Sequence, residues 1–148
     1  MKPDPANSIE LDIYDHKIIE ALRNDARASI REVAKQTKIR PSTIHLRIQK
    51  LIKNNIIEKF TLQLNDKAVG ENFIVFMFIN TSKDLSSSFF ADLRLKEAFG
   101  VTGEYDLLLK YKFKDISEFN DYVINLRKNK DIIKTLTTVC TIKLKEES

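Results

Sequence analysis

The side chains in this sequence that are best suited to chemistry are cations, and they are concentrated in the first half of the chain. Residues 23–59 hold ten Lys and Arg against three acids, a net charge of +7, whereas residues 66–148 hold 13 of each sign. Ammonium and guanidinium groups at this density attract phosphate through charge alone. The confinement of the excess to one half favours nucleic acid as partner over a merely solvated helical face.

Residues for catalysis or metal binding are scarce. Both histidines, His16 and His45, lie in the basic half, and Cys140 is the only cysteine. Cys140 is predicted to be a buried structural residue, and we expect no catalytic residue, no metal and no cofactor. Because no stretch approaches the ~20 apolar residues of a membrane span and the first residues show no hydrophobic signal region, we expect no membrane partner and a cytoplasmic location.

Three short helices are predicted to position the basic residues. Apolar residues at three-and-four spacing run through 12–23, and Ser29 with Glu32 fits a capping box at the start of a second helix. Pro41 is a suitable first residue for a third helix that runs to about Lys53. The short link between the second and third helices is typical of a helix-turn-helix, in which the third helix is the recognition element.

The apolar stripe of the third helix predicts which of its side chains face solvent. Ile44, Ile48 and Leu51 recur at i, i+4 and i+7 and must face the core, so the opposite side is free to enter a DNA groove. Polar and basic groups there suit base edges, and the cations elsewhere suit phosphate. The predicted DNA-binding residues are Arg27, Arg31, Lys38, Arg40, Ser42, Thr43, His45, Leu46, Arg47, Gln49, Lys50 and Lys53.

The second half of the chain predicts a separate α+β domain. Strands are expected at 73–81, 95–102, 105–113 and 132–145, with helices at 86–93 and after Asp115. The resulting order, βαββαβ, is the split, ferredoxin-like arrangement. Residues 57–64 alternate apolar and polar side chains and predict a linker strand. The predicted domains are therefore 1–56 for the helix-turn-helix, 57–71 for the linker strand and hinge, and 72–148 for the second domain.

Several landmarks match a known family in order along the chain. They are Leu11-Asp12 with Asp15, Asp25-Ala26-Arg27, Ser42-Thr43-Ile44 with Arg47-Ile48, and Val101-Thr102-Gly103-Glu104-Tyr105-Asp106. With these landmarks the sequence resembles the Lrp/AsnC, or feast/famine, family of transcriptional regulators from about Leu11 to Lys145. Arg40 stands where that family usually places a serine cap, and Asn55 replaces a customary glycine. The resemblance implies a winged-type helix-turn-helix domain followed by a βαββαβ domain of the RAM/ACT-like kind.

The resemblance also implies partners. It implies a homodimer, a higher oligomer such as a tetramer or octamer, duplex DNA, and an amino acid or related metabolite bound in a cleft between dimers. Gly103 would let backbone approach the effector closely, Asp106 would receive an α-ammonium group, and Thr135 or Thr137 would bond a carboxylate. The ordinary alternative is a hairpin turn and sheet-forming threonines. The predicted ligand-binding residues are Gly103, Glu104, Tyr105, Asp106, Thr135 and Thr137.

The function that these features predict is sequence-specific regulation of transcription, without enzymatic activity. One alternative is an architectural, chromatin-like DNA binder without an effector, which the same basic face would serve. A second is a haem-pathway decarboxylase, since those enzymes share a similar two-domain plan. The decarboxylase is disfavoured because the second domain has no histidine and only two arginines, Arg94 and Arg127.

Overall fold

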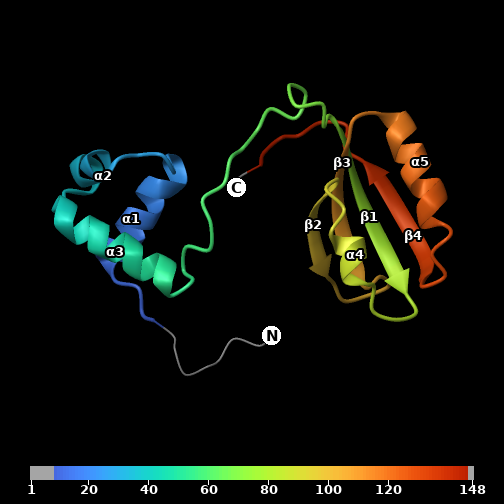
Figure 1. Ribbon diagram of the computed structural model, residues 1–148, viewed down its shortest axis with the longest axis horizontal. Helices are drawn as coiled ribbons and strands as arrows, with labels where there is room; N and C mark the ends of the chain where they lie inside the picture. Colours follow the sequence, from blue (N-terminus) through green and yellow to red (C-terminus); the bar gives the residue numbers. More distant parts are fainter. Residues whose placement is uncertain (1–8, 147–148) are drawn as a thin grey trace. The chain divides into compact units, whose positions relative to one another are not determined.

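The N-terminal unit is a bundle of three helices. In the computed structural model, which describes residues 9–146, they are α1 (Ile13–Asn24), α2 (Ile30–Thr37) and α3 (Pro41–Lys53) (Figure 1). α1 and α2 each begin with a capping box, formed by Asp12 with Asp15 and by the predicted Ser29 with Glu32. α3 begins at Pro41 as predicted, but no side chain caps its first turn. The three predicted helices are confirmed.

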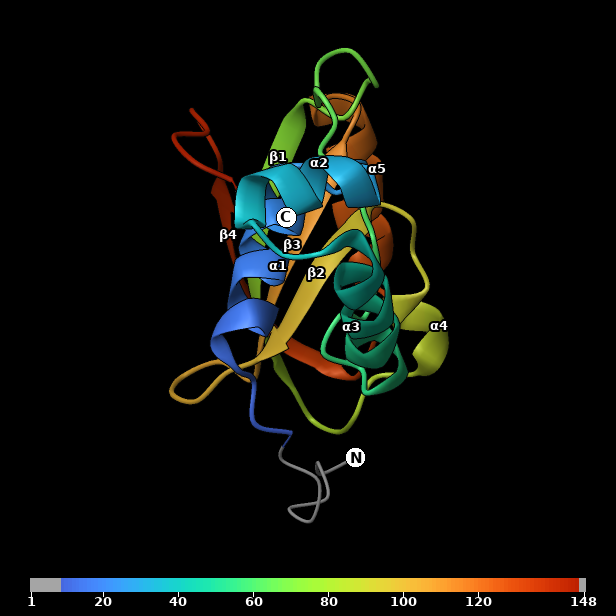
Figure 2. The same ribbon diagram turned by 90° about the vertical axis from the view of Figure 1, so that its left-hand side faces the viewer.

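One apolar cluster holds the three helices together. Ile18 of α1, Val33 of α2 and Ile44 of α3 are fully buried, Leu51 is nearly so, and Ile48 packs against them. Figure 2 shows α2 packed across α1 and α3. Because isolated helices of this length are marginally stable in water, the packing of these side chains is what stabilises the recognition helix.

The C-terminal unit is a four-stranded antiparallel sheet with two helices. Its elements are β1 (Phe73–Thr81), α4 (Ser87–Phe90), β2 (Leu95–Gly100), β3 (Leu107–Phe113), α5 (Ile116–Leu126) and β4 (Ile132–Val139). The strand order is β2-β3-β1-β4, with β1 and β3 in the centre (Figure 1). The predicted α+β class and ferredoxin-like arrangement are confirmed. The chain divides into two compact units at 62/63.

The two faces of the sheet differ. Val75, Met77 and Leu109 alternate onto one face and are buried against α5, where Tyr122 and Leu126 complete the core. The other face, which we call the open face, has half-buried aromatic and aliphatic side chains, and Phe99 and Leu136 on it are 51% and 47% exposed. The open face includes Ile74, Phe76, Phe78, Phe99, Leu108, Lys110, Lys112, Leu136 and Thr138. The open face therefore leaves apolar side chains in contact with water.

The predicted linker strand is wrong for the single chain. Within residues 9–146, no backbone hydrogen bond joins 58–64 to another segment, and Phe60, Leu62 and Leu64 are all more than half exposed. An alternating pattern becomes a strand only where a second strand supplies the bonding partners, and this chain offers none there. Cys140, predicted to be buried, is half-buried at the end of β4, where its amide donates the last bond to Ile74.

Several element ends were also predicted too long. α4 spans only four residues of the predicted 86–93, β2 ends at Gly100, β3 begins at Leu107, and β4 ends at Val139. β4 stops there because its only neighbour, β1, begins opposite at Phe73, so no strand remains for residues 141–145 to pair with. No helix within residues 9–146 is long and apolar enough to cross a bilayer.

Candidate nucleic-acid interface and effector site

The side of α3 opposite the core carries the predicted reading residues. Ser42, His45, Leu46, Gln49, Lys50 and Lys53 are exposed there, and Thr43 is half-buried. The helix rests on buried Ile44 and Leu51, which fixes its rotation so that these side chains face solvent together. The first turn of α3 lacks a capping side chain, so the positive end of the helix dipole is left for another acceptor.

The other predicted cations lie on α2 and in the links before and after it. Arg27 lies in the turn after α1, Arg31 in the first turn of α2, and Lys38 and Arg40 in the link before α3, all of them exposed. Lys38 adopts the left-handed conformation, φ 60°, that ends α2. Among the ten Lys and Arg of residues 23–59, Arg47 alone forms an ion pair with any residue of the described chain. The other nine form no ion pair with the described residues, and the stretch keeps its net positive charge.

Arg47 has a different placement from the other cations of α3. Its Nη1 donates to both carboxylate oxygens of Asp12 at 2.7 Å and to Asp15 Oδ1 at 2.9 Å, and its guanidinium lies 5.2 Å from the ring centroid of Tyr14. The hydrogen bond from Arg47, with a second from the Asp15 amide, lowers the pKa of Asp12 to about 2. Asp15 is itself only 5% exposed. Arg47 thus clamps α3 to α1, a role that spacing alone did not indicate.

Replacing Arg47 by methionine distinguishes two roles for this residue, holding α3 to α1 and contacting DNA. A residue that neutralises a phosphate contributes about 0.9 to the slope of log affinity against log salt, so we expect that slope to be unchanged in Arg47→Met. Asp12 stabilises the fold above its ordinary pKa and loses this effect only as pH falls through about 2. The variant should therefore unfold at higher pH in an acid titration. A slope reduced by about one would instead make Arg47 a phosphate contact.

The predicted effector loop is pinned to the sheet by its own chain. Gly103 has φ 123°, a conformation that favours glycine. The backbone carbonyl of Glu104 accepts from Asn80 Nδ2 at 2.9 Å, and its carboxylate pairs with Lys134 of β4. The ring of Tyr105 lies 5.7 Å from that of Phe78. These contacts tie the loop to β1 and β4.

Asp106 closes the end of β1 and lines the larger hollow near the loop. Its Oδ2 accepts from the Thr81 amide at 2.8 Å, and its own amide donates to Ile79. The hollow measures about 600 Å³ and is lined by the segment 81–85, Phe90 and Leu107 as well. The sequence pattern did not single out Ser82, Lys83 or Asp84, which have no periodicity.

Thr135 and Thr137 line a second, separate hollow. It measures about 220 Å³, lies between α5 and β4, and includes Arg127 and Lys134. The two hollows share no lining residue. Asp106 and the two threonines therefore line different hollows, although Thr135 is paired with Ile79, the residue of β1 whose carbonyl accepts from the Asp106 amide.

Known protein families match the two units of the chain separately. Residues 11–58 match the winged helix-turn-helix DNA-binding family, and residues 94–148 match the Lrp/AsnC ligand-binding domain. The HTH-type transcriptional regulator FL11 of Pyrococcus horikoshii is 34% identical over 119 residues, which cover 78% of this chain and 79% of the relative. The chain is thus a helix-turn-helix transcriptional regulator with a ligand-binding domain. Within that class it belongs to the Lrp/AsnC family, and the resemblance read from the sequence is confirmed.

Solved structures agree on the fold. Escherichia coli AsnC aligns with a TM-score of 0.82 at 27% identity, covering 95% of this chain and 98% of that one. A transcriptional regulator of Neisseria meningitidis, solved as a complex with L-methionine, aligns with a TM-score of 0.85 at 22% identity and covers 94% and 95%. Both units of the chain therefore have the architecture of known regulators of this family.

Proposed function

We propose that this regulator is sequence-specific and reads duplex DNA through the exposed side of α3. The observation that carries the proposal is the unbalanced charge of the head: within the described chain only Arg47 of its ten basic residues at 23–59 has an acidic partner. In the C-terminal unit, by contrast, Lys96, Lys110 and Lys112 are all paired with carboxylates. Unpaired cations around an exposed helix are what phosphate attraction and groove reading require.

The open face and the linker support a homodimer as the binding form. Phe99 and Leu136 on the open face and Phe60, Leu62 and Leu64 in the linker leave a large apolar area in water. A second copy would cover this area and also supply the strand partner that residues 57–64 lack. Two heads would then enter successive major grooves about one helical turn, roughly 34 Å, apart at a pseudo-palindromic site in cytoplasmic DNA. Higher assembly to a tetramer or octamer would build on this dimer.

A binding selection tests the DNA proposal. Full-length protein is used to select duplexes from a random-sequence pool, and the selected duplex is compared with its shuffled sequence at two salt concentrations. We expect a preference of roughly 10³-fold or more, with affinity for both duplexes falling steeply as salt rises. Equal, salt-sensitive binding of both duplexes would favour the architectural alternative. Light scattering of the free protein tests the dimer.

We further propose that an amino acid modulates this binding at the loop 103–106. Support comes from the ligand-binding-domain match and from the L-methionine complexes of the relatives from Neisseria meningitidis and Mycobacterium tuberculosis. Asp106 lines the hollow of about 600 Å³ beside the loop, which is where the ligand would bind. Each standard amino acid is tested for a rise in melting temperature, which binding to the native state alone must cause. If none raises it, and none shifts DNA affinity, the chain works without an amino-acid effector.

A further inference from the structure

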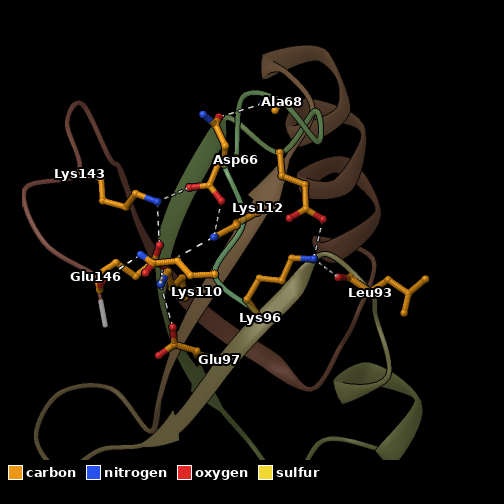
Figure 3. Close-up of polar contacts among 12 residues, drawn as sticks. Asp66, Ala68, Leu93, Lys96, Glu97, Lys110, Lys112, Lys143 and Glu146 are labelled. Atoms are coloured by element: carbon orange, nitrogen blue, oxygen red, sulfur yellow. Dashed lines mark hydrogen bonds and ion pairs between the residues drawn. The ribbon is translucent and has the colours of Figure 1, made fainter. Parts of the chain in front are cut away.

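A network of ion pairs attaches the C-terminal segment to the open face of the sheet (Figure 3). At its centre is Asp66, the first residue of the turn that precedes β1, which is 9% exposed. Asp66 Oδ1 accepts from Lys112 Nζ of β3 at 2.6 Å, and Oδ2 accepts from Lys143 Nζ of the C-terminal segment at 2.7 Å. One carboxylate thus joins three parts of the chain: the end of the linker, a central strand and the C-terminal segment.

Glu146 makes the second half of the network. Its Oε1 accepts from Lys110 Nζ at 2.5 Å and its Oε2 from Lys143 Nζ at 2.7 Å, and its backbone carbonyl accepts from Gln63 Nε2 at 2.9 Å. Lys110 also bonds Glu97 of β2 at 2.8 Å. Residues 140–146 form no strand, and these bonds, with the bond from the Cys140 amide to Ile74, help to hold the segment beside the linker.

The network is electrically balanced and stays ionised in neutral solution. Three lysines face three carboxylates, those of Asp66, Glu97 and Glu146. Burial raises the pKa of Asp66, but the hydrogen bonds from Lys112 and Lys143 outweigh it and leave that pKa below its ordinary value. The bond from Lys110, followed by that from Lys143, lowers the pKa of Glu146 to about 2. A change of pH near neutrality therefore does not open the network, and salt screens the largely buried pair of Asp66 and Lys112 less than it would an exposed pair.

We propose that Asp66 is a positioning residue for DNA binding, and that Asp66, Lys112, Lys143 and Glu146 form a clasp that fixes where the linker leaves the sheet. Residues 58–64 have no backbone bonds to hold their direction, so the first fixed point after them is the turn at Asp66. Closed ion pairs of this kind add geometric definition more than stability. The role rests on the proposed function, in which two heads hang from paired C-terminal units.

The physical consequence of the clasp concerns the second head of a dimer. Once one head is bound, the second binds at an effective concentration that depends on how tightly its tether is confined. A fixed exit point confines the tether and favours one spacing of half-sites. An open clasp lets the linker start from a wider range of positions, so several spacings become comparable.

The test uses the full-length variants Asp66→Asn and Lys143→Gln, with Asp121→Asn as control. Asp121 is exposed on α5 and outside the network, so its change of charge matches that of Asp66→Asn. Hydrogen exchange of the backbone around residues 63–70 is measured first, and we expect it to be roughly tenfold faster in both clasp variants, the equivalent of losing a charged hydrogen bond. Binding is then measured to duplexes with one half-site, and with two half-sites at different spacings.

The expected results distinguish a role of the clasp in positioning the second head from a role in stabilising the fold alone. Affinity for one half-site should be unchanged, whereas the gain from a second half-site should fall roughly tenfold and depend less on spacing. Lys143→Gln keeps Lys112 on Asp66 and serves as the readout if Asp66→Asn does not fold. Faster exchange with an unchanged spacing preference would overturn the positioning role, and unchanged exchange in both variants would refute the clasp. Failure of the wild type to bind any duplex would instead overturn the proposed function.

Discussion

Replacing Gln49 and Lys50 together by alanine is expected to lower the preference for the selected duplex over its shuffled sequence by roughly 100-fold or more. Both side chains are exposed on α3 and have no side-chain partner within the described residues, so their removal leaves nothing buried and unpaired. Glutamine reads adenine and lysine reads guanine or phosphate, and each good base contact discriminates by about 1–3 kcal/mol. Alanine preserves the helix itself.

A matched control lies on the neighbouring helix. Lys35 and Gln36 are the same two residue types, adjacent and exposed, but on α2. Their double alanine variant should weaken binding to both duplexes about equally, through the lost charge alone, and keep the sequence preference. Binding of both duplexes is measured at two salt concentrations for each variant. A control that loses as much preference as the α3 variant would contradict the assignment of α3 as the reading helix.

Replacing Ile44 by alanine is expected to destabilise the head by about 3 kcal/mol, because truncating a fully buried isoleucine costs the lost burial and the cavity left behind. A unit this small has little stability to spare, so the helix-turn-helix should be largely unfolded at growth temperature and DNA binding should be lost. The C-terminal unit has its own apolar cluster and should keep its melting transition. Calorimetry and hydrogen exchange resolve the two units.

The control for Ile44→Ala is two residues away. Leu46 is 65% exposed on the same helix, and Leu46→Ala should change stability by less than about 0.5 kcal/mol. Its DNA affinity tests separately whether an apolar side chain on the reading side contributes. If Ile44→Ala kept the head folded, or melted both units together, the division into two separately packed cores would be contradicted.

The sequence predicted those parts of the fold that local rules decide. The capping box at Ser29 and Pro41 at the start of α3 both follow from the chemistry of single residues. The positions of the C-terminal strands follow from apolar runs such as 73–81. Each of these signals lies within a few residues, so no partner distant in sequence is needed to read it.

The features that the sequence did not predict correctly depend on residues far apart in the chain. The role of Arg47 depends on Asp12, 35 residues earlier, and residues at that distance leave no periodic signal. The clasp joins Asp66 to Lys143 across 77 residues, and was missed for the same reason. Residues 57–64 show a strand's alternation but have no strand beside them in one chain. The spacing of apolar residues in the sequence predicts which face of a helix or strand a residue occupies. The residues that it contacts there are known only from the structure.

The two separate apolar clusters have a consequence for how such regulators diverge. Ile44 and its neighbours in the head share no member with the cluster around Met77 and Tyr111. Substitutions that retune the DNA target on α3 therefore do not disturb the packing beneath the effector loop, and the reverse holds too. Selection can alter what a descendant senses while leaving the genes it controls unchanged, or assign an existing sensor to new genes.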